Sequence, residues 1–383
     1  MKNNKQRVRT PPASRREPWP KSLIILFGGK SAEHEVSIQS AASVISALNT
    51  KKYDIIPIAI SKSGEWLSVG ESIKLLPGFA AVTSFAKADK KGSVDVVFPV
   101  LHGPYGEDGT MQGMLEILGV PYVGAGVMAS AVGMDKGDSK ILFESAGLNI
   151  VPWLSFLASK WKKKKDELVG DIEKRLPYPV FIKPIDLGSS VGITKAHDRK
   201  ELLKGIRLAL SYGGEVIVEG GVDAREIECS VLGNEDPVAS VPGEIIASRE
   251  FYSYEAKYTD EKSELVIPAK LTKAVTVKIQ ASAIIAFKAI KCSGMARVDF
   301  LIDKKTGKIY INEVNTIPGF TKISMYTKLW QASGVGYSAL LDKLIKLATE
   351  RHKLRSSKSG NSEDTVLLSD IYKKKLPGLT TRF

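Results

Sequence analysis

Short apolar runs alternate with longer helical stretches along the first 125 residues. The pattern predicts buried strands over 23–27, 55–60 and 96–100, and a helix over 33–48. Strands that alternate with helices form a parallel sheet. We therefore expect an N-terminal α/β domain that ends near the glycine-rich turn at 122–126.

The middle of the chain contains shorter elements that predict a compact α+β unit ending near Gly220. They are a helical stretch over 134–147, a solvated lysine run at 161–165, strands over 178–182 and 215–218, a hairpin through 188–192 and a helix from Asp198. A third α+β unit is predicted from strands over 225–232 and 237–246, a polar stretch over 248–264, a helix over 272–291 and two final strands.

The two final strands carry polar side chains two residues apart. Arg297 and Asp299 occupy one strand, and Glu313 and Asn315 occupy the next. Because side chains alternate between the two faces of a strand, each pair shares a face. Charged and amide groups gathered in one space need a charged occupant, and hard cations with phosphates are the expected one.

The charge distribution places the basic character of the chain at its two ends. The net charge is +13, of which residues 1–20 carry +5 and residues 351–383 carry +5, which leaves +3 for the 330 residues between them. We expect two solvated extensions and no nucleic-acid partner, because the near-neutral core has no stripe of basic and aromatic residues. No window approaches 18 uninterrupted apolar residues, so membrane insertion is not expected. Cys229 and Cys292 lack metal-site or disulfide spacing, which fits a reducing cytoplasm.

Several glycine-rich segments are candidates for ligand binding. Lys183 ends an apolar strand, where an ammonium group needs an anion such as phosphate, and the loop 188–192 offers flexible backbone amides and two hydroxyls. Gly28 and Gly29 make a turn that leads to Glu33 at a helix start, without the spacing of a Walker P-loop. A capped helix explains that turn equally well.

Two further segments leave alternatives open. His102 is followed by three glycines and two carboxylates, which favours a ligand loop over the structural role usual for a lone histidine. The segment 124–129 matches G-x-G-x-x-A, a pattern of dinucleotide-binding folds, but a domain joint accounts for its glycines as well. A nicotinamide-dependent dehydrogenase is therefore the alternative from a different class.

Taken together, these segments closely resemble the D-alanine:D-alanine ligase family of the ATP-grasp superfamily over about residues 21–350. The matching segments are GGKSAEHEVS at 28–37, HGPYGEDG at 102–109, MDK at 134–136, KP at 183–184 with GSSVG at 188–192, EAKY at 255–258 and NEVNTIPG at 312–319. The resemblance implies a three-domain α/β ATP-grasp fold. Its expected domains are a parallel-sheet substrate-side domain (21–125), a small α+β central domain (126–220) and an α+β catalytic domain (221–350). The basic N-terminal extension (1–20) and the basic C-terminal tail (351–383) have no counterpart in the shared motifs.

The resemblance also implies two cofactors, ATP and a pair of Mg²⁺ ions, with Mn²⁺ as an alternative. The residues implied for ATP are Lys136, Lys183, Glu219, Val222, Glu226 and Lys257. The implied metal ligands are Asp299, Glu313 and Asn315, whose oxygen atoms suit Mg²⁺. Gly220 stands where some members carry a Lys or Glu, so any adenine contact there is expected through the backbone.

The implied reaction joins two D-alanines through an acyl phosphate for peptidoglycan synthesis. Glu33 is expected to hold the ammonium of the first alanine in a triad with Ser189 and Tyr258, beside His102. Arg297 and the amide of Gly319 match the oxyanion hole of the family.

Ser324 and Met325 match the pocket of the second substrate, and Met325 replaces the Leu of other members. The presence of Tyr258 favours D-alanine as the second substrate, and D-lactate or D-serine are the alternatives. Members of the family are commonly homodimers, and we expect a cytoplasmic enzyme.

Overall fold

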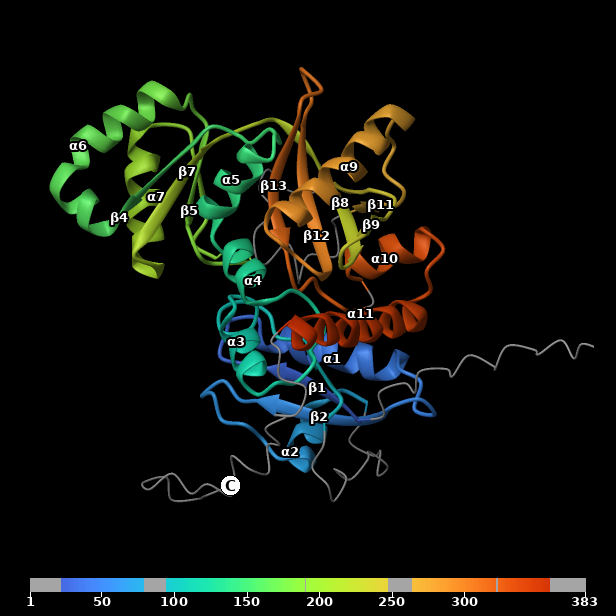
Figure 1. The fold of residues 1–383 in the computed structure, drawn as a ribbon. Coiled ribbons are helices and arrows are strands. Elements are labelled where there is room, and N and C mark those ends of the chain that lie inside the picture. The colour runs from blue at the N-terminus through green and yellow to red at the C-terminus, as the bar shows by residue number, and fades with distance from the viewer. Residues whose placement is uncertain (1–21, 79–93, 190, 247–263, 322, 359–383) are drawn as a thin grey trace, which may run out of the picture.

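The computed structural model describes residues 22–78, 94–189, 191–246, 264–321 and 323–358. Three sheets organise these residues (Figure 1). One is parallel and lies near the N-terminus, and the other two are antiparallel. The predicted α/β fold class is confirmed.

The N-terminal sheet is parallel, as the alternating pattern predicted, and its strand order is β2-β1-β3. Its elements are β1 (Ser22–Gly28), α1 (His34–Ala47), β2 (Asp54–Ile60), α2 (Val69–Leu75), β3 (Val96–Pro99) and α3 (Thr110–Ile117). Gly28 ends β1 with φ +87°, and a Cβ there would lie 2.3 Å from the carbonyl oxygen of Ile60. Only glycine therefore fits this turn, which directs the chain into α1.

The central sheet has the antiparallel order β4-β7-β5-β6. Its elements are β4 (Trp153–Leu157), α6 (Ala158–Arg175), β5 (Val180–Pro184), β6 (Thr194–Ala196), α7 (Arg199–Tyr212) and β7 (Glu215–Gly220). The helix predicted from Asp198 is α7, and Asp198 caps it by accepting a hydrogen bond from the amide of Glu201. The buried side chains of this unit form a core of their own, from Phe156 to Val218.

The C-terminal sheet follows the path β11-β10-β8-β12-β13, with β9 paired to β8. Its strands are β8 (Ala224–Gly233), β9 (Val238–Ala239), β10 (Gly243–Ile246), β11 (Glu264–Val266), β12 (Gly294–Asp303) and β13 (Ile309–Asn315). The helices α4 (Val127–Met134), α5 (Lys136–Ser145) and α9 (Lys273–Ala289) contribute Ala129, Phe143 and Phe287 to the core of this sheet. The segment that follows residue 126 thus packs with the C-terminal sheet, although the central domain was predicted to begin there.

The last two helices connect the C-terminal sheet to the N-terminal one. They are α10 (Met325–Ala332) and α11 (Tyr337–Lys358), and α11 lies beside α1 in Figure 1. Leu340, Leu344 and Ile345 of α11 share one buried core with the strands of the N-terminal sheet. Helix α11 also continues eight residues past the predicted boundary at residue 350. There Arg351 donates hydrogen bonds to the carbonyl oxygens of Gly124 and Tyr122, the latter at 3.0 Å.

Candidate active site

Glu33 lies at the start of α1, buried between the N-terminal and central units. The hydroxyl of Ser189 donates a hydrogen bond to the Glu33 carboxylate. The Ser31 hydroxyl accepts from the Glu33 amide at 3.2 Å and donates to the His102 carbonyl at 2.6 Å. A Cβ on Gly103 would lie 2.8 Å from Glu33 Oε2, so glycine allows the loop to approach the carboxylate. The predicted pairing of Glu33 with Ser189 is therefore present in the structure.

His102 is 5% exposed and is linked to the loop that follows β13. Its Nε2 lies 3.2 Å from the hydroxyl of Ser40, and that hydroxyl accepts from the amide of Phe320 at 3.4 Å. The hydroxyl of Tyr337 donates to the Phe320 carbonyl at 2.9 Å. The amide and the carbonyl of Phe320, which follows Gly319, are thus held by side chains from helices α1 and α11.

Two lysines enclose the carboxylate of Glu219 at the end of the central sheet. Lys183 Nζ lies 2.6 Å from Glu219 Oε2, and Lys140 Nζ lies 3.0 Å from Glu219 Oε1. Burial raises the pKa of Glu219, but the two ammonium groups outweigh burial and hold that pKa at about 2. The carboxylate is therefore ionised at neutral pH, and the three groups together carry one positive charge.

Lys136 lies at the start of α5, and its ammonium group donates to the carbonyl oxygens of Leu187 and Ile185, the latter at 3.4 Å. Burial lowers its pKa, and the carboxylate of Glu313 opposes that effect. Glu313 also acts on the pKa of Lys140, which burial lowers as well. The lysine side of the site therefore adjoins the carboxylates of the C-terminal sheet.

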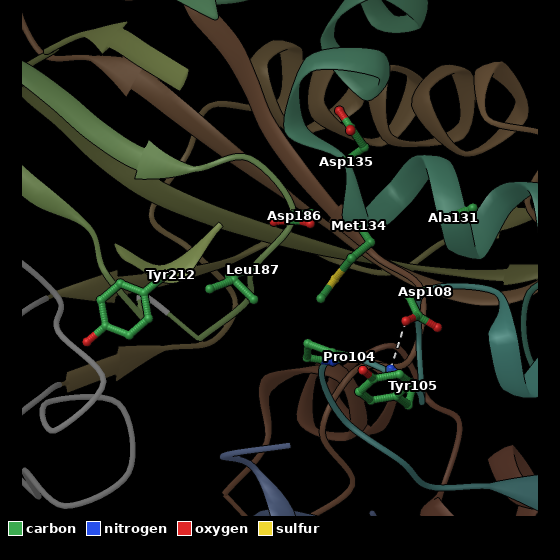
Figure 2. Close-up of a pocket in the computed structure, with 9 residues that line it drawn as sticks. All are labelled: Pro104, Tyr105, Asp108, Ala131, Met134, Asp135, Asp186, Leu187 and Tyr212. Carbon is green, nitrogen blue, oxygen red and sulfur yellow. Dashed lines mark hydrogen bonds between the residues drawn. The ribbon is translucent and has the colours of Figure 1, made fainter. Parts of the chain in front are cut away.

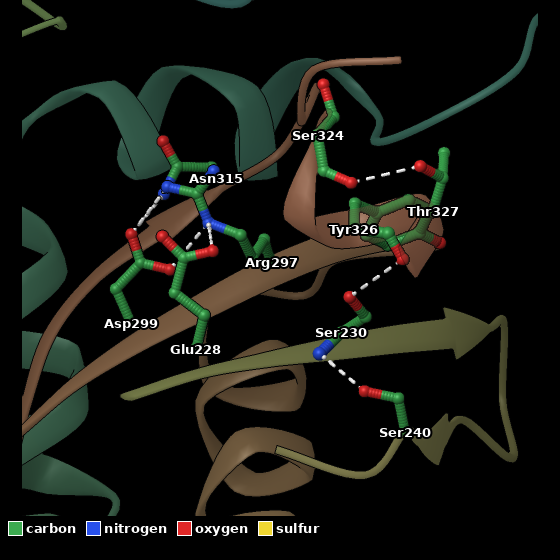
Figure 3. A network of polar contacts seen from close by, with 9 residues as sticks. All are labelled: Glu228, Ser230, Ser240, Arg297, Asp299, Asn315, Ser324, Tyr326 and Thr327. Atoms are coloured by element: carbon green, nitrogen blue, oxygen red, sulfur yellow. Dashed lines mark hydrogen bonds and ion pairs between the residues drawn. The ribbon is translucent and has the colours of Figure 1, made fainter. Parts of the chain in front are cut away.

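Arg297 is held between two carboxylates of the C-terminal sheet, as Figure 3 shows. Its guanidinium donates to Asp299 Oδ1 and Oδ2, both at 2.7 Å, and its Nε lies 3.1 Å from Glu228 Oε2. Burial lowers the pKa of Arg297, but Asp299 and Glu228 raise it well above its usual value. Asn315 Nδ2 donates to Asp299 Oδ2 at 3.0 Å. Arg297 and Asp299, which were predicted to share a strand face, therefore meet, and Asn315 of the next strand joins them.

Three carboxylates lie next to one another across three strands. Asp299 of β12 pairs with Glu228 of β8 on one side and with Glu313 of β13 on the other. Directly paired residues project from the same face of a sheet, so this face carries a concentration of negative charge.

The donor set of Asp299, Glu313 and Asn315 fits a magnesium site. Two carboxylates and one amide supply oxygen ligands, which Mg²⁺ prefers, and the register brings them to one sheet face. Over the part of the chain that the structure describes, no group of three or more His, Cys, Asp or Glu residues is arranged as a metal site. The fit therefore depends on the amide of Asn315 as the third donor.

The loop after β13 brings the predicted Gly319, Ser324 and Met325 together. A Cβ on Gly319 would lie 2.8 Å from the Ser324 hydroxyl, which accepts from the Thr321 amide at 3.0 Å. The Ser324 carbonyl accepts from the hydroxyl of Thr327 at 3.0 Å (Figure 3). Met325 is 5% exposed, with its sulfur near Gly243, so its side chain packs inside the protein.

A pocket of about 390 Å³ opens where the three units meet (Figure 2). Tyr105 and Asp108 line it from the loop after β3, Met134 from the end of α4, and Leu187 and Tyr212 from the central unit. Leu187 also accepts the hydrogen bond from Lys136, and it lies two residues from Ser189. The pocket is therefore connected to Lys136 through Leu187, whereas Glu33, Lys140, Lys183 and Glu219 do not line it.

The remaining predicted residues fall at or beyond the edge of this arrangement. Val222 follows β7 and is partly buried, and Glu226 lies on β8 two residues before Glu228, on the same strand face. Lys257 and Tyr258 lie outside the described residues, so their predicted places stay predictions.

The sequence interpretation did not select Lys140, Glu228 or Ser40. Polar residues alternate with apolar ones along β8, at Glu226, Glu228 and Ser230. The same alternation identified Arg297 and Asp299. Lys140 follows Lys136 by one helical turn, so the helical period would have placed both on one face. Ser40 had no comparable signal, because a serine in an apolar helix is common.

The segment at 124–129 is a domain joint. Gly124 lies against Gly294, where a Cβ would be 3.1 Å from the Gly124 carbonyl oxygen, and Arg351 donates a hydrogen bond to that carbonyl. The backbone of the turn is thus used in packing between units, which removes its support for a dinucleotide site.

Three α/β units around buried lysines and carboxylates define the ATP-grasp class. The model for the D-ala D-ala ligase N-terminus matches residues 22–125, and that for the D-ala D-ala ligase C-terminus matches residues 142–346. The chain therefore belongs to the D-alanine–D-alanine ligase family.

Individual relatives agree with this family over nearly their whole length. The chain is 48% identical to a D-alanine–D-alanine ligase of Chloroherpeton thalassium, covering 88% of this chain and 98% of the relative. It is 51% identical to that of Clostridium acetobutylicum, covering 87% and 99%.

Solved structures with the same fold include two ligases that are described with different second substrates. One is the VanG D-Ala:D-Ser ligase of Enterococcus faecalis, with a TM-score of 0.76 and 40% identity over 86% of this chain and 99% of that one. The other is the D-alanine–D-alanine ligase of Coxiella burnetii, with a TM-score of 0.76 and 37% identity over 89% and 97%. Within the described residues, no helix is long and apolar enough to cross a membrane.

Proposed function

We propose that this protein joins two D-alanine molecules to D-alanyl-D-alanine while it converts ATP to ADP and phosphate. The first carboxylate attacks the γ-phosphate of ATP, and the amine of the second alanine displaces phosphate from the resulting acyl phosphate. The observation that carries this proposal is the meeting of a cationic cluster around Glu219 with an anionic cluster around Asp299 at one site. Phosphates and their cations need both.

The lysine side of the site binds the nucleotide. Lys183 and Lys136 contact the phosphates, because both ammonium groups lie at the end of buried elements where an anion would compensate them. Glu219 and Val222 line the adenine, and Glu226 binds the ribose. Lys257, in the segment 247–263, offsets charge on the transferred phosphoryl group.

The carboxylate side of the site holds metal ions. Asp299, Glu313 and Asn315 would bind two Mg²⁺ ions, with Mn²⁺ as an alternative, and such ions neutralise phosphate charge. Arg297 and the Gly319 amide stabilise the oxyanion that forms as the second amine attacks.

The amino-acid subsites lie toward the N-terminal sheet. Glu33 holds the ammonium group of the first D-alanine, and Ser189 and Tyr258 orient Glu33. His102 borders this subsite, and Ser324 with Met325 bounds the second. We place the reaction in peptidoglycan precursor synthesis in the cytoplasm, and we propose a homodimer.

Incubation with ATP, Mg²⁺ and amino acid, followed by phosphate assay and mass analysis of products, tests the function. D-alanine alone should yield dipeptide and one phosphate per dipeptide, whereas L-alanine should yield none. An equimolar mixture of D-alanine with D-serine, or with D-lactate, tests the second subsite. A product formed mainly from D-alanine and D-serine, or from D-alanine and D-lactate, would mean that the second substrate is not D-alanine. The absence of phosphate release would contradict the ligase assignment.

A further inference from the structure

Lys140 is a buried cation that none of the roles above uses. It lies on α5, one turn after Lys136, and its side chain is 1% exposed. Its Nζ lies 3.0 Å from Glu219 Oε1, while Lys183 occupies Glu219 Oε2 at 2.6 Å. Each oxygen of the Glu219 carboxylate therefore faces its own lysine.

Glu219 is the only ion-pair partner of the Lys140 ammonium group among the described residues, and the two groups lie 3.0 Å apart. Burial lowers the pKa of Lys140, and the Glu219 carboxylate opposes that effect. A buried charge is costly to desolvate, and an apolar side chain of similar volume often replaces a buried ion pair without loss of stability. The presence of an ammonium group here therefore requires an explanation other than stability.

Charge balance supplies that explanation. With Lys183 as its only partner, Glu219 would form a neutral pair, and moving the Lys183 ammonium toward an anion would leave a buried carboxylate uncompensated. Truncation that leaves a buried charge unpaired is strongly destabilising. With Lys140 in place, Glu219 stays compensated while Lys183 turns to its ligand.

We infer that Lys140 is a positioning residue of the nucleotide site, which holds the Glu219 carboxylate so that Lys183 is available to the phosphates of ATP. The inference rests on the proposed nucleotide site at Lys183. Lys140 itself touches no substrate, and it acts through Glu219.

The test compares Lys140→Met with the wild type by two measurements. Nucleotide affinity is measured by titration with ATP in the absence of D-alanine, and KM is measured separately for ATP and for D-alanine. We expect the dissociation constant and the KM for ATP to rise about tenfold, equivalent to about 1.4 kcal/mol, and the KM for D-alanine to change less than about twofold. Lys278→Met on the exposed face of α9 is the matched control and should change neither.

A double-mutant cycle with Glu219 separates positioning from general damage. In the Glu219→Gln background there is no carboxylate to hold, so adding Lys140→Met should change ATP affinity less than about twofold. If Lys140→Met alone does not fold, the double variant is compared with Glu219→Gln alone, and a loss of ATP affinity of about tenfold between these two would overturn the inference. An equal loss of affinity in both backgrounds, or an equal rise in both KM values, would overturn the inference.

Lys183→Met distinguishes failure of the inference from failure of the proposed site. If Lys183→Met lowers ATP affinity and Lys140→Met does not, the role of Lys140 is wrong and the nucleotide site stands. If Lys183→Met leaves ATP affinity unchanged, the nucleotide site is wrong, and the inference fails with it.

Discussion

The charged clusters around Glu219 and Arg297 have opposite compositions. Around Glu219, two cations share one buried anion, whereas around Arg297 two anions share one buried cation. Each cluster therefore has an excess charge of one sign, positive in the first and negative in the second. An excess positive charge suits phosphates and an excess negative charge suits metal ions, so the comparison explains how one site takes both.

The largest effect should come from removing a proposed metal ligand from the negative cluster. Glu313→Ala leaves Asp299 and Asn315 as the remaining proposed donors, and we expect turnover to fall by about 10³-fold while the melting temperature stays within a few degrees. Phosphate release at saturating Mg²⁺ and thermal unfolding measure the two quantities. Glu235→Ala, at an exposed position, is the control, and near-normal turnover in Glu313→Ala would remove this residue from the metal site.

The next effect concerns Glu228, which corresponds in the negative cluster to Lys140 in the positive one. Glu228→Gln leaves Asp299 as the remaining ion-pair partner of Arg297 among the described residues, so Asp299 should be less available to a cation. We expect the Mg²⁺ concentration for half-maximal turnover to rise about tenfold. A change in the KM for D-alanine without a change in the Mg²⁺ requirement would contradict the role of Glu228 in the negative cluster, which corresponds to the role of Lys140 in the positive one.

The positive cluster should also make stability depend on pH. The pKa of Glu219 is about 2 in the folded protein and 4.5 when unperturbed, so its ionised form stabilises the fold above pH 4.5, and that stabilisation is lost as pH falls toward 2. The difference in melting temperature between wild type and Glu219→Gln should therefore be largest near about pH 6 and shrink toward about pH 3.

The exposed pair of Lys164 and Glu167 provides the control for that pH dependence. Glu167→Gln should lower the melting temperature by less than about 2 °C, because exposed ion pairs contribute little. A difference for Glu219→Gln that does not vary with pH would mean that its charge is not coupled to folding.

The smallest effect is expected at Ser40, which lies outside both clusters. Ser40→Ala removes the hydroxyl between His102 and the Phe320 amide but keeps the helix. We expect kcat to fall about threefold to tenfold, since Gly319 would be held less firmly, with little change in the KM for ATP. Steady-state kinetics measure both, and a selective change in the KM for ATP would contradict this role.

The hydrophobic cores show a second contrast, between the central unit and the rest. The central unit buries its apolar residues in a core of its own, whereas α11 completes the core of the N-terminal sheet. Arg351 adds hydrogen bonds from α11 to Tyr122 and Gly124. The N-terminal and C-terminal units thus share a core, and the contacts of the central unit with the N-terminal unit include the hydrogen bond from Ser189 to Glu33.

Local patterns in the sequence determined much of the fold. Alternation of apolar runs and helical stretches predicted a parallel N-terminal sheet, and the helix predicted from Asp198 is α7, which Asp198 caps. Period-two alternation paired Arg297 with Asp299. These predictions succeeded because strand faces, helix caps and glycine turns depend on residues that are near in sequence.

Only the tertiary structure decided which distant side chains meet. Lys140 and Glu219 are separated by 79 positions, and neither residue's neighbours indicate the other. Glu228 faces Arg297 because β8 pairs with β12, and α11 covers the N-terminal sheet because that sheet has an apolar face left to bury. Strand pairing and burial act between segments that are remote in the chain, so the sequence alone determined the elements and the residue types of the site, and the packing determined its charge balance.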